Sequence, residues 1–358
     1  MELKRAFKLL RKDVWAVASA AYILIVTLVA VFAYPLSSDK TQYANQMHLS
    51  IHSQPPGFSC NILIIPSGES ENNKSFFFGD INKNEEIPIK EIRWFDNRLS
   101  FKRYGNAISY FEERSFDQFP QGTTRKKIEA EYLKEKHFIL GTDKYGRDLL
   151  SRLIIGSRIS ISIGLVAVII SLFIGVLFGS LAGFFGGFID KLIMWLINVV
   201  WSIPTLLMVI AITLALGRGF WQVFIAVGLT MWVEVARLVR GLVKSTKEEL
   251  FIQAATTLGF SKSRILINHI LPLLIAPLIV ISAANFASAI LMESGLSFLG
   301  IGAQPPMPSW GGMIKDHFRY LLLGKPYLAI LPGLAIMSLV LAFMMLGNSF
   351  RDALDVKS

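Results

Sequence analysis

Residues 160–185 read SISIGLVAVIISLFIGVLFGSLAGFF, a run without a charged side chain. A helix needs roughly 20 mainly apolar residues to cross the hydrocarbon core of a bilayer, so this stretch is long enough to span a membrane. The whole chain has the same character. Hydrophobic residues make up 53% and charged residues 17% of its 358 positions, whereas a soluble domain carries about 25% charged residues. The sequence therefore predicts an integral membrane protein.

Five further stretches have a similar composition, which predicts about six spans and an all-α polytopic membrane fold. They are residues 14–34, 192–216, 220–235, 273–292 and 327–346. The span at 220–235 is the shortest and holds Glu234 near its end. A large helical core in a soluble protein is the alternative, but such cores do not require six apolar runs in one chain. The first span has a basic start, yet its apolar run exceeds the 7–15 residues of a usual signal core, so we expect an uncleaved anchor.

Basic residues predict the orientation, because Lys and Arg concentrate in short cytoplasmic segments. They cluster before the first span and between the fourth and fifth, which places both termini in the cytoplasm if six spans are present. A second group opposes this orientation, since it would lie outside with only partial compensation by Asp143 and Asp148: Lys144, Arg147, Arg152 and Arg158. The net charge of +10 fits contact with the anionic inner leaflet and needs no nucleic-acid partner.

Residues 35–137 separate the first two spans and are much more polar. Short β-favouring runs at 61–66, 75–79, 92–95 and 99–102 predict strands, and 129–136 predicts a short helix. We therefore expect a small, partly β extracytoplasmic insert between the anchor, residues 1–34, and a transmembrane core, residues 138–358. Cys60 is the only cysteine, so packing must hold the insert together. Two interpretations remain open: a spacer or loosely ordered loop, or a docking surface for an external binding protein.

Between the fourth and fifth spans, residues 248–272 read EELFIQAATTLGFSKSRILINHILP. The pattern predicts a helix–glycine–helix hairpin on the cytoplasmic side. Gly259 is expected to end the first helix, and Ser261 or Ser263 to begin the second. Phe251, Ala254, Ala255 and Leu258 recur at helical spacing and predict a narrow apolar face.

This hairpin resembles the EAA loop of ABC importer permeases, with Gln253 in place of the usual Glu. The resemblance implies that about 244–272 forms a coupling loop, whose helix docks on an ATP-hydrolysing subunit. Gln253 removes a charge and with it any salt bridge at that position. The residues implied in coupling are Glu249, Gln253, Ala254, Ala255, Leu258, Gly259, Phe260 and Pro272.

Three more strings narrow the resemblance to the C-type permeases of dipeptide and oligopeptide importers. Residues 140–153 read LGTDKYGRDLLSRL, 293–306 read ESGLSFLGIGAQPP, and 347–355 read GNSFRDALD. In the first string we expect Thr142 or Asp143 to cap a short helix and Arg147 to pair with Asp148. A structural elbow and a substrate contact both remain possible for it. Its structural or gating residues are Gly141, Thr142, Asp143, Gly146, Arg147, Asp148 and Arg152.

Inside the spans, Gly175, Gly179 and Gly183 recur every four residues, a pattern that lets membrane helices pack closely. We expect Pro204 to bend or begin a helix. Glu234 and Glu293 are expected near membrane boundaries, within reach of water.

The family resemblance implies a type I ABC importer permease that works by alternating access. Its implied partners are a second, B-type permease, two ABC ATPases that bind ATP and magnesium, and an extracytoplasmic solute-binding protein. The sequence contains no phosphate-binding loop, no Cys/His metal cluster and no evident nucleophile with a base, so we expect neither a cofactor nor an enzyme activity in this chain. Rival readings are an ATPase-independent transporter, a membrane-anchored enzyme with a catalytic insert, or an ABC permease for nickel chelates or peptide antibiotics.

Overall fold

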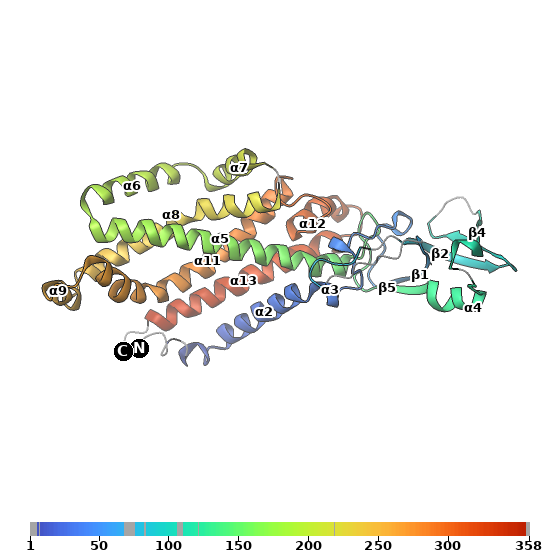
Figure 1. The fold of residues 1–358 in the computed structure, drawn as a ribbon, viewed down its shortest axis with the longest axis horizontal. Coiled ribbons are helices and arrows are strands. Elements are labelled where there is room, and N and C mark those ends of the chain that lie inside the picture. Colours follow the sequence, from blue (N-terminus) through green and yellow to red (C-terminus); the bar gives the residue numbers. More distant parts are fainter. Residues whose placement is uncertain are drawn as a thin grey trace.

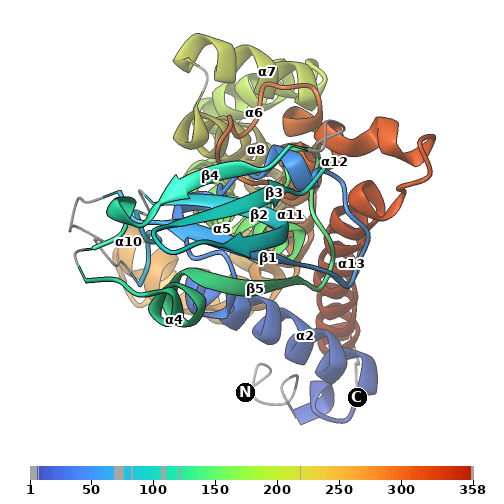
Figure 2. The same ribbon diagram turned by 90° about the vertical axis from the view of Figure 1, so that its right-hand side faces the viewer.

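The computed structural model describes residues 6, 8–67, 76–81, 84–105, 110–120, 122–217 and 219–355. A bundle of long helices carries a β-sheet at one end, and both chain termini lie at the other (Figure 1). We call these the insert end and the terminal end. Viewed from the insert end, the sheet lies in front of the bundle (Figure 2).

Five helices are long and apolar enough to cross a membrane. They are α2 (Val14–Val31), α5 (Leu149–Phe185), α8 (Phe220–Lys247), α11 (Leu271–Phe298) and α13 (Tyr327–Asp355). The short segments α10 (Lys262–Arg264) and η5 (Ile265–Ile270) lead directly into α11. Shorter elements join the long helices: α3 (Ala33–Leu36), η1 (Gln42–Ala44), η2 (Leu49–Ile51), α9 (Leu250–Thr257), α12 (Trp310–His317) and η6 (Phe318–Leu321).

The expected third span is not one helix. It consists of α6 (Gly187–Trp201) and α7 (Thr205–Leu216), bent by 90° at the break between them. Pro204 explains the break, because proline disfavours helical backbone at the preceding residue, and here it caps the start of α7. The pair still returns the chain to the insert end. Near the start of α6, Asp190 pairs with Arg240 in the C-terminal half of α8. Phe220, which follows α7 and begins α8, lines a cavity with Tyr34 at the insert end. With the bent pair counted as one span, the structure has six candidate crossings, in agreement with the expected number of about six.

The three spaced glycines lie on the face of α5 that packs against α8. A Cβ on Gly179 would lie 2.5 Å from the carbonyl oxygen of Ala236, and one on Gly175 would lie 2.5 Å from the Val235 side chain. Gly183 meets Arg240 and Val243 in the same way. Their expected role in close packing is confirmed.

The insert forms a five-stranded antiparallel sheet in the order β4-β3-β2-β1-β5. Its strands are β1 (Phe58–Ile65), β2 (Glu85–Trp94), β3 (Arg98–Arg103), β4 (Glu112–Ser115) and β5 (Leu133–Phe138). One face packs on η3 (Phe116–Gln118) and η4 (Ile128–Tyr132), with Leu63, Phe101 and Ile128 fully buried there. The short α4 (Arg125–Lys127) precedes η4 and is exposed. The insert therefore has a hydrophobic core of its own.

Three of the four expected strands overlap β1, β2 and β3, although Pro66 and Phe95 lie one residue past the ends of β1 and β2. The fourth, 75–79, is wrong where it is described: residues 76–78 form a turn, and Ser75 lies outside the described residues. The expected helix at 129–136 is half wrong, because residues from Leu133 onward pair with β1 as β5. Burial raises the pKa of the Cys60 thiol to about 11, so the lone cysteine is a packed, unreactive thiol.

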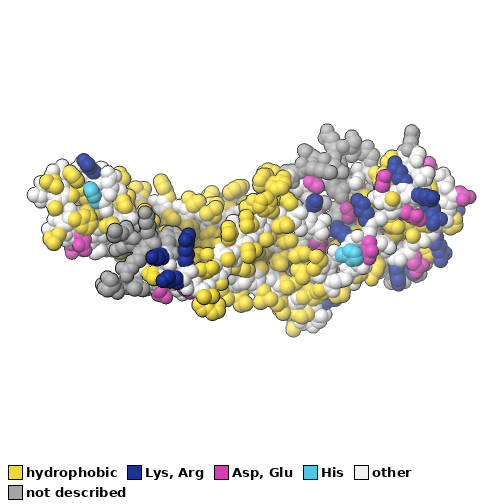
Figure 3. All heavy atoms as spheres, turned by 90° about the horizontal axis from the view of Figure 1, so that it is seen from below, with side chains coloured by type: hydrophobic (Ala, Val, Ile, Leu, Met, Phe, Trp, Pro, Cys, Tyr) yellow, Lys and Arg dark blue, Asp and Glu magenta, His cyan; other side chains and the backbone are white. Residues whose placement is uncertain are grey.

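The surface agrees with a membrane position for the bundle. Hydrophobic side chains cover its middle, and charged side chains gather towards the two ends of the molecule (Figure 3).

Candidate functional site

At the insert end, residues 141–148 form a tight turn that begins α5. Thr142 and Asp148 pair as an isolated β-bridge, and Asp148 caps α5 by accepting from the backbone N–H of Ser151 at 3.1 Å. The expected short helix capped by Thr142 or Asp143 is therefore wrong. The motif instead starts the longest helix of the bundle.

Asp143, rather than Asp148, is the partner of the motif's arginines. Its carboxylate lies 2.7 Å from the guanidinium of Arg147 and 3.7 Å from that of Arg152, and all three residues are buried. Asp148 instead accepts from the Ser38 hydroxyl at 2.5 Å and from the backbone N–H of Ser151, both through Oδ2. The expected Arg147–Asp148 pair is therefore wrong.

The same turn holds the segment that leads into the insert. Thr142 Oγ1 donates to the carbonyl of Ile51 at 2.5 Å and accepts from the backbone N–H of Gln54 at 2.9 Å. Arg147 donates to Asn45 Oδ1 at 3.0 Å. Gly146 has φ +73°, and a Cβ there would overlap the carbonyl oxygen of His48. Residues 43–54 thus pack directly on the motif, a contact that sequence spacing could not reveal.

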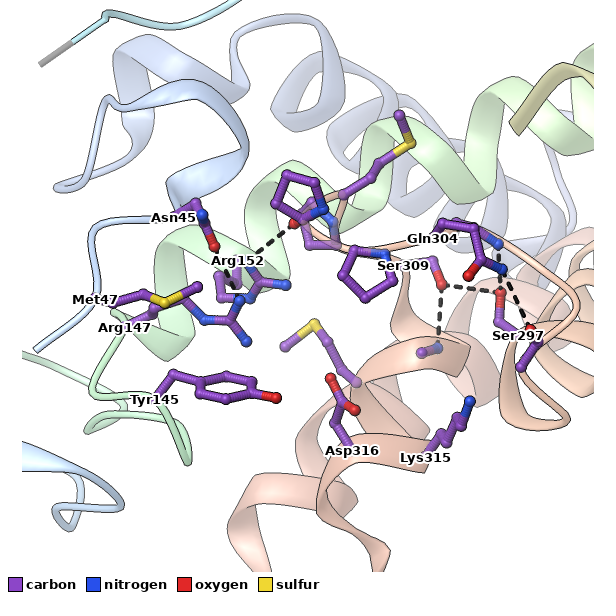
Figure 4. A pocket seen from close by; sticks show the side chains of 18 residues that line it. Asn45, Met47, Tyr145, Arg147, Arg152, Ser297, Gln304, Ser309, Lys315 and Asp316 are labelled. Carbon is purple, nitrogen blue, oxygen red and sulfur yellow. Dashed lines mark hydrogen bonds between the residues drawn. The ribbon is translucent and has the colours of Figure 1, made fainter. Parts of the chain in front are cut away.

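A cavity of about 530 Å³ opens beside this turn (Figure 4). Its walls come from residues 45–47, the motif, the loop 300–309 and α12. Lys144 pairs with Asp316 at 3.0 Å. Burial lowers the pKa of His317, although the charge of Asp143 opposes that shift. Its Nδ1 lies 2.7 Å from the Met313 carbonyl, which suits a neutral imidazole with the proton on Nδ1.

Glu293 lies in α11 beneath the same loop. It is fully buried, so the expectation that it reaches water is wrong. Ser297 donates to its Oε1 at 2.6 Å, and the hydroxyls of Ser297 and Ser309 are 3.1 Å apart. This chain of hydrogen bonds fixes the loop 300–309 to α11.

At the terminal end, the expected hairpin is present. Gly259 follows α9 with φ +80°, a conformation that favours glycine, and Ser261 caps α10. Glu249 is the N-cap of α9. Pro272 occupies the first turn of α11.

The two faces of α9 differ. Ile252 and Ala255 are buried in a cluster with Val239 and Val243 of α8. On the opposite face Leu250 is 81%, Phe251 49% and Leu258 75% exposed. The expected single apolar face is thus divided, because Ala255 turns inward while Phe251, Ala254 and Leu258 stay exposed. Gln253 is exposed, and its amide donates to the carbonyl of Glu248 at 3.0 Å.

Among the described residues, no group of three or more His, Cys, Asp or Glu side chains is placed to hold a metal ion. The structure therefore defines a class: a multi-pass membrane protein with a β insert at one end and an exposed apolar hairpin at the other.

Comparisons with known proteins define the family. A family model described as binding-protein-dependent transport system inner membrane component matches residues 175–357. The dipeptide transport system permease protein DppC of Alkalihalophilus pseudofirmus is 42% identical over 217 residues, 61% of this chain and 71% of that protein. The glutathione transport system permease protein GsiD of Shigella flexneri is 44% identical over the same shares of both chains. A chain of the MetNI methionine ABC transporter, solved in inward-facing conformations, aligns with a TM-score of 0.45 at 17% identity, covering 57% of this chain and 96% of that one.

The chain belongs to the family of inner membrane components of binding-protein-dependent transport systems. It is a multi-pass inner membrane protein and a permease subunit of an ABC importer, not an enzyme. Permeases of this family act with ATPases, a partner permease and a binding protein, and the ATPases bind the ATP.

Proposed function

We propose that this chain is the C-type permease of an importer that carries short peptides across the cytoplasmic membrane. Its relatives DppC and GsiD, whose names specify dipeptide and glutathione transport, support this cargo class. The proposed assembly contains this chain, a B-type permease, two ATPases and an extracytoplasmic solute-binding protein.

The exposed face of α9 is the observation that carries the coupling role. Leu250, Phe251 and Leu258 present apolar side chains to solvent, and exposed apolar groups of this kind mark protein contacts. An ATPase subunit docks there. The buried face then transmits its movement, because Ile252 and Ala255 are packed on α8.

This assignment places the terminal end in the cytoplasm. Positive charges of α8 lie towards that end, including Lys244 and Lys247, as the positive-inside tendency predicts. The four opposing basic residues at the insert end are held by protein groups. Asp143 holds Arg147 and Arg152, Asp316 holds Lys144, and Arg158 donates to the carbonyl of Phe77. Their external position is therefore compatible with this orientation.

For the motif at 141–152 we propose the elbow role. Its charged residues Asp143, Arg147 and Arg152 are buried and bonded within the chain, which leaves them few atoms to offer a passing solute. The motif fixes the outer end of α5 and supports the loop around the 530 Å³ cavity.

The coupling assignment is tested with Leu258→Glu in the complete transporter, reconstituted in proteoliposomes with its binding protein. A charge on this exposed residue leaves the fold intact but weakens an apolar contact with the ATPase. We expect ATP-dependent uptake of a dipeptide to fall at least about tenfold, the change that accompanies ~1.4 kcal/mol, while the subunit still inserts.

Leu322→Glu is the matched control, since Leu322 is also exposed but follows α12 at the insert end. It should leave the uptake rate close to wild type. Wild-type uptake by Leu258→Glu would contradict the coupling role. Failure of the wild-type transporter to take up any short peptide would contradict the cargo.

A further inference from the structure

One unpaired carboxylate lies inside the membrane-spanning part of the bundle. We expected Glu234 near a membrane boundary, but α8 continues to Lys247. Glu234 is the fifteenth of the 28 residues of α8 and the first charged one. The basic residues of this helix begin at Arg237, three residues further on, about 4.5 Å along the axis. Glu234 therefore lies near the middle of the span, just before its basic part begins.

Glu234 has an exposed side chain and forms no hydrogen bond or ion pair with the residues that the structure describes. The nearest cation on its own helix is Arg237, one turn further on. That guanidinium lies 3.5 Å from the ring centroid of Trp201 and donates to Asn198 at 3.2 Å. Arg237 is thus held against α6, and Glu234 remains without a counter-ion.

The carboxylate lines a small cavity of about 50 Å³ where α6 breaks from α7. Thr205, Thr230 and Ser288 line it too, and Glu234 is the one charged residue in its wall. The C-terminus of α6 and the N-terminus of α7 meet here, so their opposite partial charges largely cancel. The full charge of Glu234 therefore makes this cavity attractive to a cation. Its volume suits an ammonium group or one or two waters, each needing about 30 Å³, but not a whole peptide.

We propose that Glu234 forms a subsite of the translocation path, where its carboxylate receives the positively charged group of the passing solute. For a short peptide this group is the N-terminal ammonium, a step that rests on the proposed function. An exposed, unpaired charge is costly against lipid, and charges at membrane depth usually face a bundle interior or a water-filled cavity. The face where α6, α7, α8 and α11 meet around Glu234 therefore borders the aqueous path rather than lipid.

Cysteine accessibility tests the position of this face. Cys60 is replaced by Ser, and single cysteines are introduced as Thr205→Cys, Ser288→Cys and, as a control on the outer face of α2, Leu24→Cys. The complete transporter is then treated with a charged methanethiosulfonate reagent, which reacts with thiolates in water. We expect labelling at positions 205 and 288 during ATP turnover and none at 24. Absence of labelling at both cavity positions would overturn the proposal.

The charge preference is tested with Glu234→Gln and Glu234→Asp. Uptake of a free-amine peptide and of its N-acetylated form is measured with the same binding protein. For each peptide, the uptake rate of the variant is divided by that of the wild type, so any preference of the binding protein for one peptide cancels. With Glu234→Gln we expect this ratio to fall about tenfold for the free-amine peptide and to stay near one for the acetylated peptide. Glu234→Asp should restore part of the loss.

Equal effects of Glu234→Gln on both peptides, or no effect on either, would overturn the ammonium subsite. Both results presuppose a wild-type transporter that takes up peptides with ATP. An incorrect cargo therefore appears earlier, as absent wild-type uptake, and is distinguishable from a failed subsite.

Discussion

At the scale of single residues, Asp143 is the buried carboxylate that two arginines share. It faces two arginines that are almost fully buried, and removing one partner from a buried ion pair costs about 3–5 kcal/mol. We expect Asp143→Asn to lower the free energy of unfolding of the assembled subunit by about that amount. Denaturant unfolding of the purified transporter in detergent measures this change.

Asp316→Asn provides the comparison for that variant. Its ion pair with Lys144 is partly exposed, at 33% and 24% of the two side chains, and such pairs contribute about 1 kcal/mol or less. A loss of similar size in both variants would contradict the special role of Asp143.

The sequence identified the charged residues of this motif, but not how they pair. Asp143 and Asp148 are both close enough to Arg147 along the chain. The choice depends on the left-handed turn at Gly146 and on Ser38, which lies far away in sequence and bonds Asp148. Gln253 is a second example. From the sequence, Gln in place of Glu predicts only the loss of a charge. The structure shows an added hydrogen-bond donor, since a carboxylate could not donate to the Glu248 carbonyl.

At the scale of elements, the α5–α8 contact depends on glycine. We expect Gly179→Ala to destabilise the subunit by about 1–3 kcal/mol, the usual cost of overpacking, because the new Cβ would meet the Ala236 carbonyl. Gly241→Ala in α8 meets no atom within 4 Å and should be neutral or stabilise the helix by up to about 1 kcal/mol. Thermal stability of the assembled transporter measures both. A larger loss at Gly241 than at Gly179 would contradict this packing.

Elements with strong local signals were predicted well from sequence. Long apolar runs gave the spans, and Gly259 with Ser261 gave the hairpin. Elements whose form depends on distant partners were not: residues 133–136 have helical composition but pair with β1. Pro204 predicted that a helix bends or begins here. The angle between α6 and α7 could not be predicted, because it depends on how the two helices pack around this residue.

At the scale of the molecule, α5 connects the two functional ends. Asp148 anchors its start beneath the insert. Near its other end, the carbonyl of Phe184 accepts from Lys247 at 2.8 Å, and Phe184 packs in the same cluster as Ile252 of α9. In the coupling role that we propose, a displacement of α9 by an ATPase would act on the end of α5 opposite the motif. The close α5–α8 contact at Gly175, Gly179 and Gly183 would carry this displacement to α8 as well.

A variant that lacks the β-sheet can measure what the sheet contributes. Ser59 and His137 are directly paired in neighbouring antiparallel strands, so a two-residue Asn-Gly turn can join them and replace residues 60–136. This variant keeps residues 43–54, which bond to Thr142, Arg147 and Arg152. We expect it to assemble with its partners and to keep its basal ATPase activity. The stimulation by binding protein then measures what the sheet adds: retained stimulation favours a spacer, and lost stimulation a docking surface.

A longer deletion, residues 42–136, supplies the contrast. It removes the carbonyls of Tyr43 and Ile51 that accept from Arg152 and Thr142, and leaves a buried guanidinium and hydroxyl without those acceptors. An unsatisfied buried donor costs about 1–3 kcal/mol, and more when charged. We therefore expect the longer deletion, unlike the shorter, to abolish assembly, as measured by co-purification of the partner permease and the ATPases. If both variants assembled equally well, residues 43–54 would not be needed to hold the motif at the start of α5.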